Sequence, residues 1–176
     1  METEKIYFSE TQKFRQIWVW VLLVIIVVIG FYGMFQQLVI GKPFGNNPSS
    51  DEMLVVFSII PVLLFFLFLF WIKLKTEICA EGVSIQFLPV HIKPKKIEWS
   101  EIESFQLREY RPLAEYGGWG VRRGLSGKNI AYNISGNTGL QLVLKNGKKI
   151  LVGTNKPVEM EIVLDQLRKN LRIISK

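Results

Sequence analysis

The chain has 176 residues, of which 49% are hydrophobic, and a formal net charge of +7 at neutral pH. One cysteine excludes an intramolecular disulfide and any metal site built from several cysteines, and one histidine excludes a histidine-rich metal centre. The longest apolar runs lie before residue 75, whereas residues 75–176 hold 17 Lys/Arg against 10 Asp/Glu, a difference that equals the whole net charge. The composition therefore predicts an apolar region followed by a basic domain.

The N-terminal region begins with a polar segment, residues 1–16, which we expect to be cytoplasmic. Lys13 and Arg15 lie just before residues 17–35, which carry no charge. This apolar stretch is too long for the core of a signal peptide, and no small-residue cleavage site follows it. Residues 17–35 are therefore predicted to form an uncleaved transmembrane helix.

A second apolar stretch, residues 53–74, has no charge before Lys73. As a helix it is about 33 Å long, enough to cross a bilayer core of about 30 Å. Residues 36–52 between the two stretches are rich in Gly, Pro, Asn and Ser and are typical of a loop. Together residues 17–74 are predicted to form a transmembrane helical hairpin, in which Gly30 and Gly33 permit close helix packing.

Basic residues flank the two outer ends of this hairpin, with Lys13 and Arg15 at one end and Lys73 and Lys75 at the other. The positive-inside rule then places both termini and residues 75–176 in the cytoplasm, with residues 36–52 outside. The predicted location is the cell membrane (plasma or inner membrane), with the chain crossing it more than once. A transporter or pump is not expected, because neither helix core contains an ionisable side chain.

From Lys75 onward, apolar and polar residues alternate with a period of two, which is typical of strands. Asn146-Gly147 predicts a tight hairpin turn. Val158, Ile162 and Leu167 recur at near-helical spacing and predict an amphipathic helix over 157–171. The predicted strands are 76–80, 83–87, 95–99, 102–109, 130–134, 139–144 and 148–152.

About seven strands followed by one helix suit a small antiparallel barrel with a helix closing one end. With the run Ile97-Glu98-Trp99-Ser100-Glu101-Ile102, this order resembles the bacterial pleckstrin-homology-like (PH-like) membrane proteins with two helices, a family of unknown function. The resemblance implies an α+β membrane protein: a two-helix transmembrane hairpin, then a PH-like antiparallel β-barrel or sandwich, then an amphipathic helix. Phosphoinositide-binding members of the pleckstrin-homology class carry basic residues at the turn between their first two strands. Here that turn carries Glu81 and no basic residue, so we do not expect it to bind such a head group.

The long loop 110–129 is the candidate ligand or partner site. Its glycines let the backbone approach a ligand, its basic residues can bind anions, and its aromatic residues can stack or enter a membrane interface. The alternative is a structural loop in which a tryptophan plugs the barrel. The loop matches neither a P-loop nor a dinucleotide fingerprint. The candidate residues are Arg111, Tyr116, Gly117, Gly118, Trp119, Gly120, Arg122, Arg123 and Lys128.

These features predict a non-catalytic binding or scaffold module, anchored in the bilayer, that presents a basic domain to a protein partner or to anionic lipid head groups. The alternative is a membrane enzyme that acts on an anionic substrate at loop 110–129, with a glutamate as the base. We expect no catalytic residues, cofactor, metal site or nucleic-acid partner, and a homo-oligomer is left open. The nearby cluster Lys93, Lys95 and Lys96 is interpreted as an edge that discourages aggregation.

Overall fold

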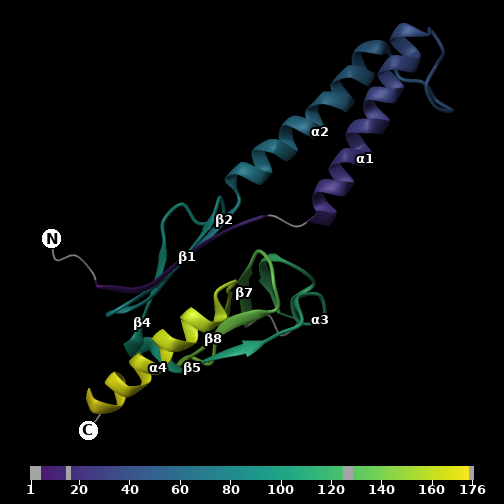
Figure 1. Cartoon of the computed structure of the whole chain (residues 1–176). Helices are drawn as coiled ribbons and strands as arrows, with labels where there is room; N and C mark the ends of the chain where they lie inside the picture. Colours follow the sequence, from purple (N-terminus) through teal and green to yellow (C-terminus); the bar gives the residue numbers. More distant parts are fainter. Residues whose placement is uncertain (1–4, 15–16, 125–128, 175–176) are drawn as a thin grey trace. The chain divides into compact units, whose positions relative to one another are not determined.

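The computed structural model describes residues 5–14, 17–124 and 129–174 (Figure 1). The chain divides into two compact units: Arg15–Trp71 forms one, and Met1–Phe14 together with Ile72–Lys176 forms the other. The division differs from the boundaries expected from the sequence, 1–16, 17–74 and 75–176. The N-terminal segment is part of the C-terminal domain, and the helices interrupt that domain.

Two helices, α1 (Ile17–Met34) and α2 (Asp51–Trp71), make up most of the interrupting unit. A π-helical turn, Phe35–Val39, continues α1. A Cβ atom added at Gly30 would lie 3.1 Å from the Oγ atom of Ser58 on α2. Gly30 therefore faces α2 at close range, as expected, whereas Gly33 faces the Phe44 side chain of the connecting loop.

Apolar side chains cover the outside of both helices. Among the described residues, one helical stretch, Val19–Val39, is long and apolar enough to cross a membrane. On both helices large apolar side chains are exposed, for example Val28 on α1 and Phe57 on α2. The structure thus supports one of the two predicted membrane spans, and the second stays a prediction.

The first sheet of the domain has four antiparallel strands in the order β1-β2-β3-β4. Their bounds are β1 (Ile6–Lys13), β2 (Lys73–Cys79), β3 (Gly82–Leu88) and β4 (Lys95–Glu98). The sequence does not predict β1. Lys13 pairs with Lys73 across β1 and β2, so the chain leaves the sheet for the helices and returns to it at directly opposite positions.

The second sheet has five strands in the order β5-β8-β9-β7-β6, antiparallel except for the parallel pair β7 and β9. A short helix, α3 (Pro112–Tyr116), and strand β6 both form within the predicted loop 110–129. The described residues therefore hold nine strands rather than about seven, and the mixed α+β class is confirmed. The bounds are β5 (Ile102–Glu109), β6 (Gly120–Arg123), β7 (Asn129–Asn133), β8 (Thr138–Leu144) and β9 (Lys149–Gly153).

The two sheets enclose one hydrophobic core, to which helix α4 (Pro157–Ile174) also contributes. The sequence predicts an inward stripe that begins at Val158, but Val158 and Ile162 are exposed. The inward residues of α4 are Met160, Leu164 and Leu167, all of them buried. The helix thus packs on the core as predicted, and Leu167 of the predicted stripe is buried, but Val158 and Ile162 lie outside the buried face.

Two polar residues of β1 face inward and join this strand to the start of α4. The carboxyl group of Glu10 accepts a 2.6 Å hydrogen bond from the Thr154 hydroxyl and a 2.9 Å bond from the Asn155 backbone N–H. The Gln12 side-chain amide donates a 2.7 Å bond to the Gly153 carbonyl. Since Glu10 and Gln12 are both buried, these bonds form away from water and hold β1 in the domain.

Candidate functional site

A basic groove lies between the edge strand β4 of the first sheet and the strands of the second sheet. It has a volume of ≈ 490 Å³. Four cationic side chains line this groove: Lys95 and Lys96 come from β4, Arg123 from the end of β6, and Lys148 from the turn between β8 and β9. All four are exposed. We call this site the basic groove.

The local structure explains why these cations can collect there. β4 and β6 are edge strands, so one side of each is not paired in its sheet. Edge strands commonly carry basic side chains, because charge discourages pairing with another chain. Lys148 follows the tight turn at Gly147, whose φ of 77° is one that glycine adopts without strain. The groove therefore draws its charge from three separated parts of the sequence.

The floor of the basic groove is apolar, and its charge is largely unbalanced. Ile97, Leu144 and Ile150 line it and are buried. Within the described residues, the side chains of Lys95, Arg123 and Lys148 make no ion pair. The single acidic lining residue, Glu101, accepts a 3.2 Å hydrogen bond from the Glu98 backbone N–H in its own turn. Such a groove favours an anionic group with several acceptor oxygens.

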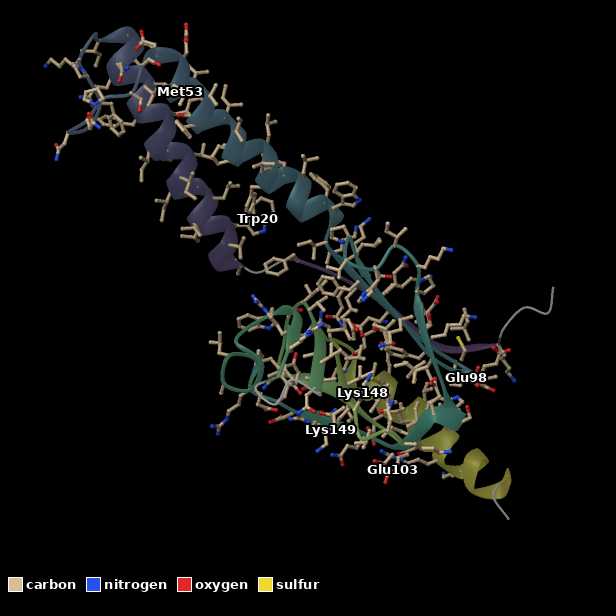
Figure 2. The ribbon with its side chains drawn as sticks, turned by 180° about the vertical axis from the view of Figure 1, so that it is seen from behind. Trp20, Met53, Glu98, Glu103, Lys148 and Lys149 are labelled. Atoms are coloured by element: carbon tan, nitrogen blue, oxygen red, sulfur yellow. The ribbon has the colours of Figure 1, made fainter. Side chains whose placement is uncertain are left out.

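Successive residues at the β8–β9 turn serve different faces of the second sheet. Lys148 lines the basic groove, whereas Lys149 lines a depression on the other face of the sheet. Figure 2 labels both side chains at this turn. Arg122 and Arg123 differ in the same way, since Arg122 donates a 3.0 Å bond from Nε to the Trp119 carbonyl and does not line the groove.

The structure does not gather the predicted loop residues at one site. Arg123 lines the basic groove, while Arg111 immediately precedes α3 and Tyr116 ends it, on the outer face of the second sheet. Trp119 is half-buried and donates from Nε1 to the Gly136 carbonyl over 3.3 Å. It is absent from the residues that form the hydrophobic core, so it does not plug the interior between the two sheets. Lys128 lies outside the described residues.

The glycines of the predicted site shape the backbone. Gly117 ends α3 in the left-handed conformation with φ of 69°. Gly120 has φ of 118°, and its N–H donates a 2.9 Å bond to the Asn133 side chain, which leads the chain into β6. Gly118 also has a positive φ. These positions are explained by local folding, and none of them lines the basic groove.

Arg108, which the sequence does not single out, fixes α3 to the outer face of the second sheet. Its guanidinium contacts both Glu115 carboxylate oxygens, at 2.7 and 3.3 Å, and donates a 3.1 Å bond to the Gln141 side chain. Glu115 also accepts a 2.8 Å bond from the Arg111 backbone N–H. The hydrogen bond from Arg108 is the main cause that lowers the pKa of Glu115.

This ion pair gives no support to the enzyme alternative. A general base works best with a pKa near the operating pH, and Glu115 is shifted away from that range. Burial raises the pKa of Tyr110 and of Tyr116 above their ordinary value, so neither phenol loses its proton near neutral pH. Arg108, Glu115 and the two tyrosines are best explained as a structural contact between α3 and the sheet.

Sequence reasoning missed most of the basic groove. It treated Lys95 and Lys96 as a surface edge, and it gave Lys148 no role. The sequence does show many basic residues after residue 92, among strands that otherwise alternate apolar and polar residues, and this density could have indicated a basic surface. The position of Arg123 opposite β4 depends on tertiary packing, which no local pattern reports.

Comparison with known proteins identifies a family. A family model described as "Family of unknown function (DUF6141)" matches residues 1–166. The matched region starts before β1 and includes α1, α2 and both sheets, so it spans the interrupted domain and the helices together. No curated protein and no solved structure matches the chain.

Proposed function

The chain belongs to DUF6141, a family of unknown function, and from that premise we propose that it is a membrane-anchored, non-catalytic binding module. In this proposal α1 and α2 form a transmembrane hairpin, and the domain built from the two sheets is a PH-like module on the cytoplasmic side of the cell membrane. The basic groove receives an anionic group of the binding partner. This group is carried either by a lipid or by an acidic protein.

The observation that carries the anchoring proposal is the pairing of Lys13 with Lys73. Because these residues are opposite each other, the two connections to the helices start at the same end of the paired strands β1 and β2. A chain that leaves this end of the sheet and returns to it must cross the bilayer an even number of times. The length and apolar character of α1 and α2 fit two crossings, and the exposed apolar side chains on both helices fit contact with lipid.

The topology can be tested by cysteine labelling in intact cells. In a Cys79→Ala background, we expect Ser49→Cys to react with a membrane-impermeant maleimide from outside. Ser175→Cys should react only after permeabilisation, because both termini are proposed to be cytoplasmic. Labelling of both positions from the same side would still fit a domain attached to one membrane face, but it would exclude the two-span hairpin.

The binding proposal rests on the cations of the basic groove, of which Lys95, Arg123 and Lys148 make no ion pair within the described residues. Opposed by only one acidic lining residue, they attract an anion, and the apolar floor reduces competition from water. The arginine adds a planar fork that can bind two oxygens of a phosphate or carboxylate at once. No comparable set of acid–base groups in the described residues supports catalysis, so binding is the function proposed.

The groove can be tested with two charge-matched double variants. Arg123→Ala/Lys148→Ala removes two groove cations, whereas Arg122→Ala/Lys149→Ala removes the neighbouring cations that do not line the groove. At about 1 kcal/mol for each cation near an anionic lipid, the groove variant should bind about thirtyfold more weakly. The control variant should lose much less, and high salt should reduce the difference.

The measurement uses the full-length protein in neutral detergent and two soluble probes. Short-chain phosphatidylserine represents a lipid source of the anion, and an oligo-glutamate peptide represents an acidic protein. Selective loss of one probe in the groove variant would identify the source. If both double variants bound both probes as well as the wild type does, the groove would not be the binding site.

A further inference from the structure

We infer that loop 89–94, between β3 and β4, inserts its apolar tip into the surface of the lipid bilayer. This inference rests on the proposed membrane anchoring and names a second contact with the membrane. Ile92 is 83% exposed and Val90 is 60% exposed. Ile92 is thus more exposed than any other large hydrophobic residue among the described residues, although its backbone carbonyl is hydrogen-bonded to Gln86 of β3.

The position of the loop follows from strand pairing within the first sheet. Leu88, the last residue of β3, pairs with Lys73, and Lys73 pairs with Lys13. Loop 89–94 therefore begins at the end of the first sheet where β1 leads into α1 and where α2 leads back into β2. If the helices cross a bilayer, their short connections to β1 and β2 keep this end of the sheet at the membrane surface.

Hydrogen bonds hold the loop in a fixed shape. The His91 backbone N–H donates a 2.7 Å bond to the Phe87 carbonyl, and the Gln86 side-chain amide donates a 2.7 Å bond to the Ile92 carbonyl. The His91 ring packs edge-on against Tyr132, with ring centroids 5.4 Å apart. His91 is thereby held against the domain while the residues on either side of it are exposed, so little ordering is needed for Val90 and Ile92 to enter the bilayer.

The surrounding charges favour lipid over a protein partner. Lys93 follows the apolar tip, and Lys13 and Lys73 lie at the same end of the first sheet. An apolar tip flanked by lysines suits an anionic membrane surface, where the side chains cross the head-group layer and the cations stay in it. A protein interface usually buries about 800 Å² on each partner and is depleted in lysine, whereas this tip offers two side chains.

The test uses the full-length Cys79→Ala protein in vesicles of phosphatidylcholine and phosphatidylserine, with an environment-sensitive dye on Lys93→Cys. Lipids that carry a quencher near the head group should reduce the dye's emission. The additional changes Val90→Ser/Ile92→Ser should remove most of this quenching. Leu113→Ser is the matched control, because Leu113 is also exposed (69%) but lies on α3, and it should change nothing.

A dye on Val28→Cys of α1 separates this inference from the proposed anchoring. Quenching at Val28 by lipids labelled deep in the bilayer, with no quenching at Lys93, would overturn the loop insertion and leave the anchoring proposal intact. Quenching at Lys93 that persists in Val90→Ser/Ile92→Ser would also overturn it. Absence of quenching at both positions would overturn the anchoring proposal and this inference together.

Discussion

A fragment of residues 75–176 is expected not to fold as a stable monomer, although it matches the domain boundary predicted from the sequence. The fragment lacks β1, and it therefore lacks the core residue Phe8 and leaves one edge of β2 unpaired. It also lacks Leu74, which is fully buried. Losing one large core side chain costs about 2–5 kcal/mol, and the whole stability of a domain is about 5–15 kcal/mol. The combined losses are comparable to that total.

Residues 1–14 joined to residues 72–176 through Asn-Gly should behave differently. Since Lys13 and Lys73 are directly opposite, a tight hairpin turn can replace the helices just beyond this pair. We expect this joined domain to be soluble and monomeric by size-exclusion chromatography and to melt cooperatively. If the fragment of residues 75–176 melted at the same temperature as the joined domain, β1 would contribute nothing to the fold.

The failure to predict β1 has a definite physical cause. A strand with one buried face normally alternates between apolar and polar residues, and that pattern is the main sequence signal for a strand. The inward positions of β1 are Phe8, Glu10 and Gln12, of which two are polar. Their burial is compensated because residues 153–155 supply hydrogen-bond partners for the Glu10 carboxyl group and for the Gln12 amide nitrogen. That compensation arises at the far end of the chain, so a local pattern cannot reveal it.

Other elements were predictable because their signals are local. Strand β5 has the bounds expected from alternation, and the turn at Asn146-Gly147 joins β8 to β9 as predicted. Helix α4 starts at Pro157 as expected. By contrast, the five glycines of loop 110–129 hide α3 and β6, because glycine lowers the propensity for both helix and strand.

The candidate site shows the same division between local and distant information. That the domain binds anions is an expectation available from its charge alone. Which cations act together cannot be predicted in this way, since the groove combines Lys95, Arg123 and Lys148 from two strands and a turn that meet only in the folded domain. Nine residues were proposed from the sequence, and among the eight that the structure describes only Arg123 lines this groove.

Replacing Glu10 by Ala is expected to destabilise the domain by about 2–4 kcal/mol. The change leaves the Thr154 hydroxyl and the Asn155 N–H without the acceptor that the buried carboxyl group supplies. An unsatisfied buried donor costs about 1–3 kcal/mol. The Thr154 hydroxyl becomes such a donor, and the lost bond from the partly buried Asn155 N–H adds a smaller cost. The midpoint of denaturant-induced unfolding should therefore fall, with little change in the slope of the transition.

Two further variants separate this effect from a general loss of charge. Glu10→Gln keeps one oxygen acceptor and should be destabilised less than Glu10→Ala, because only one of the two donors loses its partner. Glu77→Ala removes the carboxylate of a surface pair with Lys75, 2.9 Å away, and should cost about 1 kcal/mol or less. Equal destabilisation by Glu10→Ala and Glu77→Ala would mean that the bonds to Thr154 and Asn155 do not hold β1 in the domain. If Glu10→Ala is the more destabilising variant, as expected, then β1 depends for its place in the domain on Thr154 and Asn155, which follow the last strand.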